Sequence, residues 1–275
     1  MSGRRKSSPR RARDETHPRD RGTKAPPGAR AAIAGGPAED IAGRRVKAVD
    51  ALRGGAILAM IGYHFAFDLR FYGVTRSDFE GDPFWLAARA AIVTSFMLLV
   101  GVSLRLAHEA GVPGRHFARR IALVAACALA ATVASYLVFP QRFIYFGILH
   151  CIAVASVLAR PLAARPGLAF ALGVAAIAAG LSLSHPFFDS RATSWLGFNT
   201  AKPPTEDFVP LFPWFGVALV GIALGASLFR RAFAPVAAFG RAPAPLRWLG
   251  QHSLAVYMVH QPLLLGVLWL AVGRQ

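Results

Sequence analysis

Long apolar stretches recur along the chain, and short segments that are basic or rich in proline and glycine separate them. A helix needs about 20 predominantly apolar residues to cross the hydrocarbon core of a bilayer. Seven stretches come near that length, and they cover residues 52–72, 84–107, 120–139, 143–159, 167–184, 211–229 and 253–271. The pattern predicts an all-α fold, a polytopic transmembrane helical bundle of about seven spans.

The composition agrees with a membrane protein. The chain is 55% hydrophobic and 16% charged, with a mean hydropathy of +0.43, which is too apolar for an ordinary soluble domain. Cys127 and Cys151 lie inside apolar stretches without metal-ligand spacing, so we expect packing residues and neither a disulfide framework nor a metal site. Gly216, Gly221 and Gly225 form a stripe of small residues that predicts close packing of the sixth span.

The loops between the predicted spans differ in charge. With seven spans and a cytoplasmic N-terminus, the second, fourth and sixth connections face the cytoplasm and should be basic. They contain one carboxylate, Glu109, and ten arginines: Arg105, Arg115, Arg119, Arg120, Arg160, Arg165, Arg230, Arg231, Arg241 and Arg247. The other connections hold Asp78, Glu80, Asp82, Asp189, Glu206 and Asp207. The bias predicts a multi-pass protein of the inner (plasma) membrane with its N-terminus in the cytoplasm.

A basic tail precedes the first span. Residues 1–43 are rich in arginine, proline, alanine, glycine and serine without apolar periodicity, so we expect them to be disordered, with residues 44–275 forming the transmembrane domain. Residues 1–47 contain 13 Lys and Arg against five Asp and Glu, about half of the formal net charge of +17. We expect this tail to lie beside anionic membrane lipid and not to bind nucleic acid.

Ionisable residues are rare inside the predicted spans, and their insertion cost makes each a candidate functional group. Arg53 and His64 are eleven residues apart on the first span. That spacing is three helical turns plus about 20°, so both side chains should share one face about 16 Å apart. A long ligand with a phosphorylated cytoplasmic end could then contact both residues, with Arg53 binding phosphate and His64 near its reactive end.

Three further positions lie near His64 in this reading. Asp68 is one turn after His64, so its carboxylate could hold one ring nitrogen and leave the other as a base. The alternative is that Asp68 pairs with Arg89 on the second span, which would neutralise two costly charges. His150 enters the fourth span at a similar depth and is interpreted as a second catalytic residue facing the same cavity, or alternatively as a structural histidine between helices.

Two residues on the last two predicted spans are expected to line a substrate cavity together with Arg89. His260 lies in the middle of the last span, two residues before a proline that frees a backbone carbonyl. Trp214 lies in an aromatic, proline-rich entry into the sixth span, as in an interfacial belt. These positions complete the candidate site.

The chain resembles the heparan-α-glucosaminide N-acetyltransferase catalytic-domain family, in its compact bacterial branch, over residues 44–271. The stretches that carry the resemblance are VDALRGGAI at 49–57, YH at 63–64, DL at 68–69, FGILH at 146–150 and LFPWFG at 211–216. The spacing from Arg53 to His64 and the sequence from Ser253 to Pro262 are also similar to the membrane acyltransferase-3 family.

These resemblances imply an acyltransferase. The donor would be acetyl-CoA or another acyl-CoA, used as a co-substrate without a permanently bound cofactor or a metal, and the acceptor an amino or hydroxyl group of a cell-envelope glycan. Arg53 and His64 are the matched motif positions; Arg53, together with Asp50, is assigned to coenzyme binding, and His64 is the base. In lysosomal members the proposed catalytic histidine lies in the first luminal loop, and residues 70–83 here contain no histidine. The acyltransferase-3 pattern is therefore the better template for His64.

Two other classes of protein fit the same residues. Proton-coupled transporters also use intramembrane His, Asp and Arg groups, although transport does not require the spacing between Arg53 and His64. An internal two-fold repeat would favour transport, and the sequence shows none. A non-catalytic scaffold is the third reading, and the substitution His64→Ala should leave such a protein active.

Overall fold

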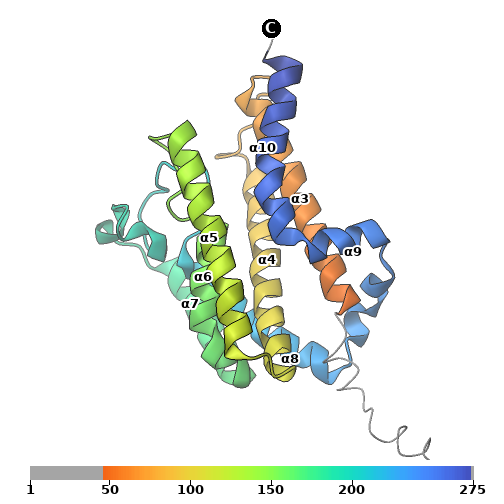
Figure 1. Ribbon diagram of the computed structural model, residues 1–275. Coiled ribbons are helices and arrows are strands. Elements are labelled where there is room, and N and C mark those ends of the chain that lie inside the picture. The colour runs from red at the N-terminus through yellow and green to blue at the C-terminus, as the bar shows by residue number, and fades with distance from the viewer. Residues whose placement is uncertain (1–45, 274–275) are drawn as a thin grey trace, which may run out of the picture. The chain divides into compact units, whose positions relative to one another are not determined.

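The computed structural model describes residues 46–273, and that range is helical without a strand, which confirms the predicted all-α fold for this part of the chain (Figure 1). Its α-helices are α3 (Lys47–Phe71), α4 (Pro83–Glu109), α5 (Gly114–Val138), α6 (Ile148–Ala159), α7 (Pro166–Ser182), α8 (Leu211–Arg230), α9 (Ala244–Gln251) and α10 (Ser253–Val272). Short 3₁₀ helices are η1 (Arg160–Ala164), η2 (Pro186–Asp189), η3 (Ser194–Leu196) and η4 (Ala234–Arg241). The predicted disordered tail, residues 1–43, lies outside the described residues.

Four of the described helices, α4, α5, α8 and α10, are long and apolar enough to cross a membrane. α6 and α7 are apolar but shorter. α3 has 25 residues, yet it is not among the four, because polar groups such as Arg53, His64 and Asp68 lower its hydropathy. These helices support a membrane protein, while the count of seven spans and the cytoplasmic N-terminus stay predictions.

The predicted fourth span needs a correction, because its helix, α6, begins at Ile148 and not at residue 143. The backbone before Ile148 bonds to the long loop that precedes α8. The Thr205 hydroxyl donates to the Phe143 carbonyl oxygen at 2.8 Å, and the Val209 amide donates to the Phe146 carbonyl oxygen at 3.3 Å. The two segments therefore run side by side over one end of the helices.

Local signals fix the ends of α4. The Asp82 side chain accepts a hydrogen bond from the Phe84 amide at 2.8 Å, and Pro83 occupies the first helical turn, where its missing amide hydrogen costs nothing. Gly111 follows the helix with a φ of +61°, a conformation that glycine adopts without steric cost. These residues define the longest helix of the described chain, which lies at its centre.

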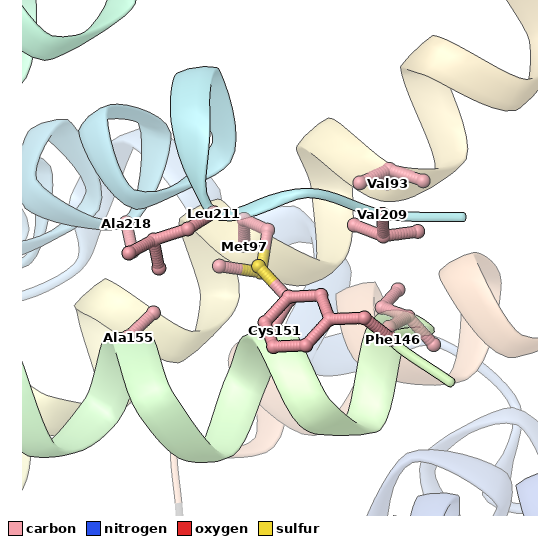
Figure 2. Packing of buried hydrophobic residues seen from close by; sticks show 9 residues of the cluster. Val93, Met97, Phe146, Cys151, Ala155, Val209, Leu211 and Ala218 are labelled. Carbon is pink, nitrogen blue, oxygen red and sulfur yellow. The ribbon is translucent and has the colours of Figure 1, made fainter. Parts of the chain in front are cut away.

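The core is centred on Met97 of α4, which is fully buried. Figure 2 shows Met97 between Cys151 and Ala155 of α6 on one side and Leu211 and Ala218 of α8 on the other. Cys151 is fully buried in this cluster, which confirms the packing role expected for it. The side chains interlock α4, α6 and α8 and so hold the helices that surround the candidate site.

The glycine stripe of α8 packs closely against two neighbours, as predicted. A side chain at Gly221 would meet the backbone of Gly101 on α4, and a side chain at Gly216 would meet the backbone of Gly173 on α7. Close approach of backbones through small residues is typical of helix contacts in membranes, where dispersion contacts supply much of the association energy. α8 is thereby held between α4 and α7.

The connection from α8 to α10 was expected only as a basic loop, but it contains α9, which lies against α3 (Figure 1). Gly250 of α9 contacts the backbone carbonyl of Asp50, and the Gln251 side-chain amide donates to Asp50 Oδ2 at 3.1 Å. α9 thus fixes the charged first half of α3, which contains two candidate residues.

Candidate functional site

Three cavities follow one another through the helices. The His64 cavity lies where the second half of α3 and the start of α4 meet the loops before α6 and α8. The Arg53 cavity lies deeper, between α3, α4, α5, α6 and α10. The Arg160 groove lies at the other end, between the end of α4, the start of α5 and the end of α6. Their cavity volumes are about 100, 100 and 570 Å³, so the Arg160 groove is the widest of the three.

Neighbouring cavities share walls. The His64 cavity and the Arg53 cavity are both lined by Phe96, Ile148 and Tyr257. The Arg53 cavity and the Arg160 groove share Ser103 and Arg120 among other residues. The three spaces therefore adjoin one another in a series between the arginine-rich end of the helices and the end where the acidic loops lie. Arg53 and His64, predicted to contact one ligand, lie in two adjoining cavities of this series.

His64 lines the first cavity and contacts a second histidine. Its ring lies edge-on to the His260 ring, with centroids 5.1 Å apart. His260 Nδ1–H donates to the Tyr257 carbonyl oxygen at 2.6 Å, because a carbonyl can only accept. That bond leaves Nε2 of a neutral His260 unprotonated, and this buried atom has no partner among the described residues. The pair joins α3 to α10 beside the cavity.

The predicted hydrogen bond between Asp68 and His64 is absent from the described residues. Asp68 is almost fully buried, and its Oδ1 accepts from the Gln261 side-chain amide at 2.8 Å. The alternative pairing with Arg89 is also absent, since the Arg89 guanidinium donates to the Phe208 carbonyl oxygen at 3.4 Å. Helix packing brings α10 against this end of α3, so Asp68 binds across the two helices and not along its own.

Asp207 lies in the same cavity, in the loop before α8. Its Oδ2 accepts from the Ile148 backbone amide at 3.0 Å, at the N-terminus of α6, where an anion is favoured by the helix dipole. Burial nevertheless raises the pKa of the Asp207 carboxyl above its ordinary value, while the Ile148 bond and Arg89 oppose that rise. The cavity thus holds a carboxyl group and a guanidinium that interact electrostatically.

The rim of the His64 cavity has two ion pairs. Arg142 Nε lies 2.7 Å from Glu206 Oε1, and Lys202 Nζ lies 3.1 Å from Glu80 Oε1. The hydrogen bond from Lys202 lowers the pKa of the Glu80 carboxyl. Together with Arg89 and Asp207, the cavity lining contains as many carboxylates as guanidinium and ammonium groups. Such a lining offers donors and acceptors to a polar ligand without a strong net charge.

Of the two predicted coenzyme-binding residues, Arg53 lines the Arg53 cavity, whereas Asp50 is not among its lining residues. An Arg53 guanidinium nitrogen donates to the Ser103 hydroxyl at 2.8 Å, and a second nitrogen lies 3.4 Å from Asp50 Oδ1. Asp50 is also bound by Gln251 through its other oxygen. Asp50 therefore orients Arg53 and is itself held by α9, and Arg53 faces the cavity from the side of the Arg160 groove.

The Arg160 groove has the features of an anion site. Its lining includes Arg120, Arg160, His108 and His116 and has no carboxylate among its described residues. The Arg160 guanidinium lies over the Phe117 ring, with 4.1 Å between its central carbon and the ring centroid. Arginines beside an aromatic face can bind phosphate groups and stack on a planar base. Among the described residues, no group of three or more His, Cys, Asp or Glu is placed to hold a metal ion.

Three predicted site residues, His150, Trp214 and His260, are not among the residues that line the His64 cavity, although His150 was interpreted as facing it and the other two as lining it. His150 Nδ1 accepts from the Gly147 amide at 3.2 Å, and its Nε2 lies 3.2 Å from the Thr132 hydroxyl. Both ring nitrogens thus bond to protein, as in the structural alternative. Trp214 packs against the core cluster around Met97. His150 on α6 and Trp214 on α8 therefore contact neighbouring helices and not the cavity.

Several lining residues were not predicted from the sequence as parts of a site. Tyr257 of α10 lay within a similar stretch but was given no role, and Asp207 was assigned only to a connection between spans. Arg160 was assigned to a basic loop, and Ser103 was not considered. The aromatic, proline-rich segment next to Asp207 could have indicated that this loop belongs to the site, because proline and aromatic residues make a loop rigid enough to cover one. Nothing in the sequence marked Ser103.

Comparison with known proteins gives one match. A family model described as "Heparan-alpha-glucosaminide N-acetyltransferase, catalytic" matches residues 45–262. No curated protein and no solved structure matches the chain. The matched range contains every residue described above as lining the three cavities. The match is to a transferase and gives no support to the transporter alternative.

Proposed function

The chain belongs to the heparan-α-glucosaminide N-acetyltransferase catalytic family, and from that premise we propose that it transfers acetyl groups from acetyl-CoA to an amino or hydroxyl group of a cell-envelope sugar. The coenzyme binds from the arginine-rich end and the sugar binds in the His64 cavity. The reaction takes place inside the helices, where the two meet. The proposal adds to the family's acetyltransferase activity the end of the protein at which each substrate binds.

The observation that carries the proposal is the series of cavities with shared walls. The Arg160 groove offers guanidinium and imidazole groups to the phosphates of the coenzyme, and its Arg160–Phe117 stack offers a platform for the adenine. Arg53 and Ser103 lie farther along, where the pantetheine arm would enter. A coenzyme bound in this way presents its thioester toward the His64 cavity.

The His64 cavity supports a sugar as the acceptor. Aromatic rings such as Phe79 and Phe208 line it beside charged side chains such as Arg89 and Asp207. A sugar ring has apolar faces that pack on aromatic rings and hydroxyl groups that bond to charged groups, so this mixture matches it. The balanced charge of the lining favours a polar ligand over a free anion or cation.

In the proposed reaction His64 acts as the general base. His64 removes a proton from the acceptor nitrogen or oxygen as that atom bonds to the thioester carbonyl carbon. The carbon–sulfur bond then breaks, and the coenzyme thiolate leaves and is protonated. His260 contacts the His64 ring, and the Asp68–Gln261 bond holds α3 against α10. We assign these residues positioning roles, with the imidazole of His64 alone in contact with the acceptor.

The test uses the full chain reconstituted in lipid nanodiscs with ¹⁴C-acetyl-CoA and envelope glycans. We expect labelled glycan from the wild-type protein and little from the variants His64→Ala and Arg53→Ala. Exposed residues outside the three cavities provide matched controls, His185→Ala and Arg76→Ala, which should retain activity. Release of the label by hydroxylamine distinguishes an ester from an amide. Labelled glycan from both cavity variants at wild-type rates would refute the proposal.

A further inference from the structure

The boundary between the His64 cavity and the Arg53 cavity consists of three side chains from three helices. Phe96 comes from α4, Ile148 from α6 and Tyr257 from α10, and each lines both cavities. Phe96 and Ile148 are apolar, so among the described residues Tyr257 is the only one shared by the two linings whose side chain can donate a hydrogen bond.

Tyr257 is held firmly at this boundary. Its ring packs against the core cluster that includes Val93 and against a second cluster that includes Val124. Its backbone carbonyl accepts from His260 Nδ1–H at 2.6 Å, and the two rings lie 5.4 Å apart. His260 also contacts His64, so a chain of contacts fixes the position of Tyr257 relative to the proposed base.

The Tyr257 hydroxyl differs from those of two other partly buried tyrosines. The Tyr72 hydroxyl donates to the Leu265 carbonyl oxygen at 3.2 Å, and the Tyr145 hydroxyl lies 2.7 Å from the Ser194 hydroxyl. Within residues 46–273 no hydrogen bond is formed by the Tyr257 hydroxyl. A tyrosine hydroxyl inside a protein usually finds a partner, so a hydroxyl without one at the wall of two cavities is suited to a ligand.

We propose that Tyr257 is a catalytic residue that donates a hydrogen bond to the acyl carbonyl oxygen during transfer. The inference rests on the proposed acetyltransferase function. When the acceptor attacks the carbonyl carbon, the carbonyl electron pair moves onto oxygen, and the Tyr257 hydroxyl binds this developing oxyanion. The electron pair returns as the carbon–sulfur bond breaks and the coenzyme thiolate leaves. Tyr257 keeps its proton throughout, and His64 takes the proton of the acceptor.

This position suits an oxyanion donor on chemical grounds. The acyl carbon must contact both the donor sulfur, in the Arg53 cavity, and the acceptor atom, in the His64 cavity, so its oxygen lies at the boundary. Phe96 and Ile148 make the rest of this boundary apolar, and a hydrogen bond in apolar surroundings stabilises charge more than one in water. Loss of one such donor commonly lowers kcat by about 100-fold to 1000-fold.

The experiment compares the full-length wild-type protein with Tyr257→Phe in nanodiscs. This substitution keeps the ring that packs against both clusters and removes only the hydroxyl. We expect kcat to fall by about 100-fold or more while the KM for acetyl-CoA stays within roughly two-fold, because the bond forms only in the transition state. Tyr136→Phe, at an exposed position of α5, is the matched control and should keep the wild-type kcat.

A second readout separates a chemical role from a structural one. Incorporation of 3-fluorotyrosine at position 257 keeps the hydroxyl and the shape of the ring but makes the hydroxyl more acidic. The hydrogen-bond donor is thus retained, so kcat should stay within about ten-fold of the wild-type value, and a loss as large as that of Tyr257→Phe would overturn the proposal. A Tyr257→Phe protein with wild-type kcat, or with a raised KM alone, would also overturn it. If wild-type protein transfers no acetyl group, the proposed function fails as well, so the two failures are distinguishable.

Discussion

The packing of α4 against α8 makes a quantitative prediction for the substitution Gly101→Ala. An added methyl group would overlap the Ala218 carbonyl oxygen and lie 2.8 Å from the Gly221 Cα atom. Both atoms belong to helix backbone, so the helices must move apart and part of the contact between α4 and α8 is lost. Overpacking of this kind costs typically about 1–3 kcal/mol. At roughly 2–4 °C per kcal/mol for a chain of this size, the melting temperature should fall by about 2–12 °C.

Labelling of the native Cys151 provides the assay, in a background in which the partly exposed Cys127 is replaced by alanine. Cys151 is fully buried, so a thiol-reactive fluorophore in detergent solution labels it only when the helices separate on heating. The matched control is Gly266→Ala in the middle of α10, where an added methyl group meets no atom within 4 Å. That change should leave the melting temperature unchanged or raise it, since alanine favours a helix by about 0.4–1 kcal/mol. Equal melting temperatures for the two variants would refute the packing argument.

Three further predictions concern the cavities. Phe96→Ala should widen the boundary and raise the rate with butyryl-CoA relative to acetyl-CoA by about ten-fold, as measured in competition assays; an unchanged ratio would contradict it. Arg160→Gln should raise the KM for acetyl-CoA about ten-fold with kcat unchanged, because a charge-assisted bond to phosphate is lost; a fall in kcat alone would contradict it. Burial raises the pKa of Asp207, so the folded protein binds this proton more tightly than the unfolded chain does. The wild-type protein therefore loses stability as pH rises from the ordinary carboxyl range through that raised value. Asp207→Asn removes this slope, so its melting temperature minus that of wild type should increase with pH through that window and then level off; a constant difference would contradict it.

Residues of the candidate site could be predicted only where a single helix was enough to identify them. Arg53, His64 and Arg89 were identified as costly polar groups in apolar segments, and each lines a cavity. The reading of Asp68 failed because its partner, Gln261, is on another helix far along the chain. The same limitation applies to His150, whose partner Thr132 lies on α5, since a sequence pattern does not show which faces of two helices meet.

The loops show a second limit. Asp207 was placed in a connection between spans, where the structure has a loop, but its contribution to the His64 cavity comes from hydrogen bonds that fold this loop over the end of the helices. Glycine patterns were more informative. Gly216 and Gly221 predicted close packing, because a helix surface without side chains has few alternatives to contact with another backbone.

By itself the sequence determined that the chain forms apolar helices in a membrane protein and where most of them begin and end. The physical reason is local: in hydrocarbon, backbone hydrogen bonds must be satisfied within each segment, so the length of an apolar run fixes a helix. Only the tertiary structure decided that α9 binds Asp50, that α10 places His260 against His64, and that Tyr257 lies between the two cavities. Those relations depend on the rotation and crossing of packed helices, and side-chain contacts between distant segments fix both.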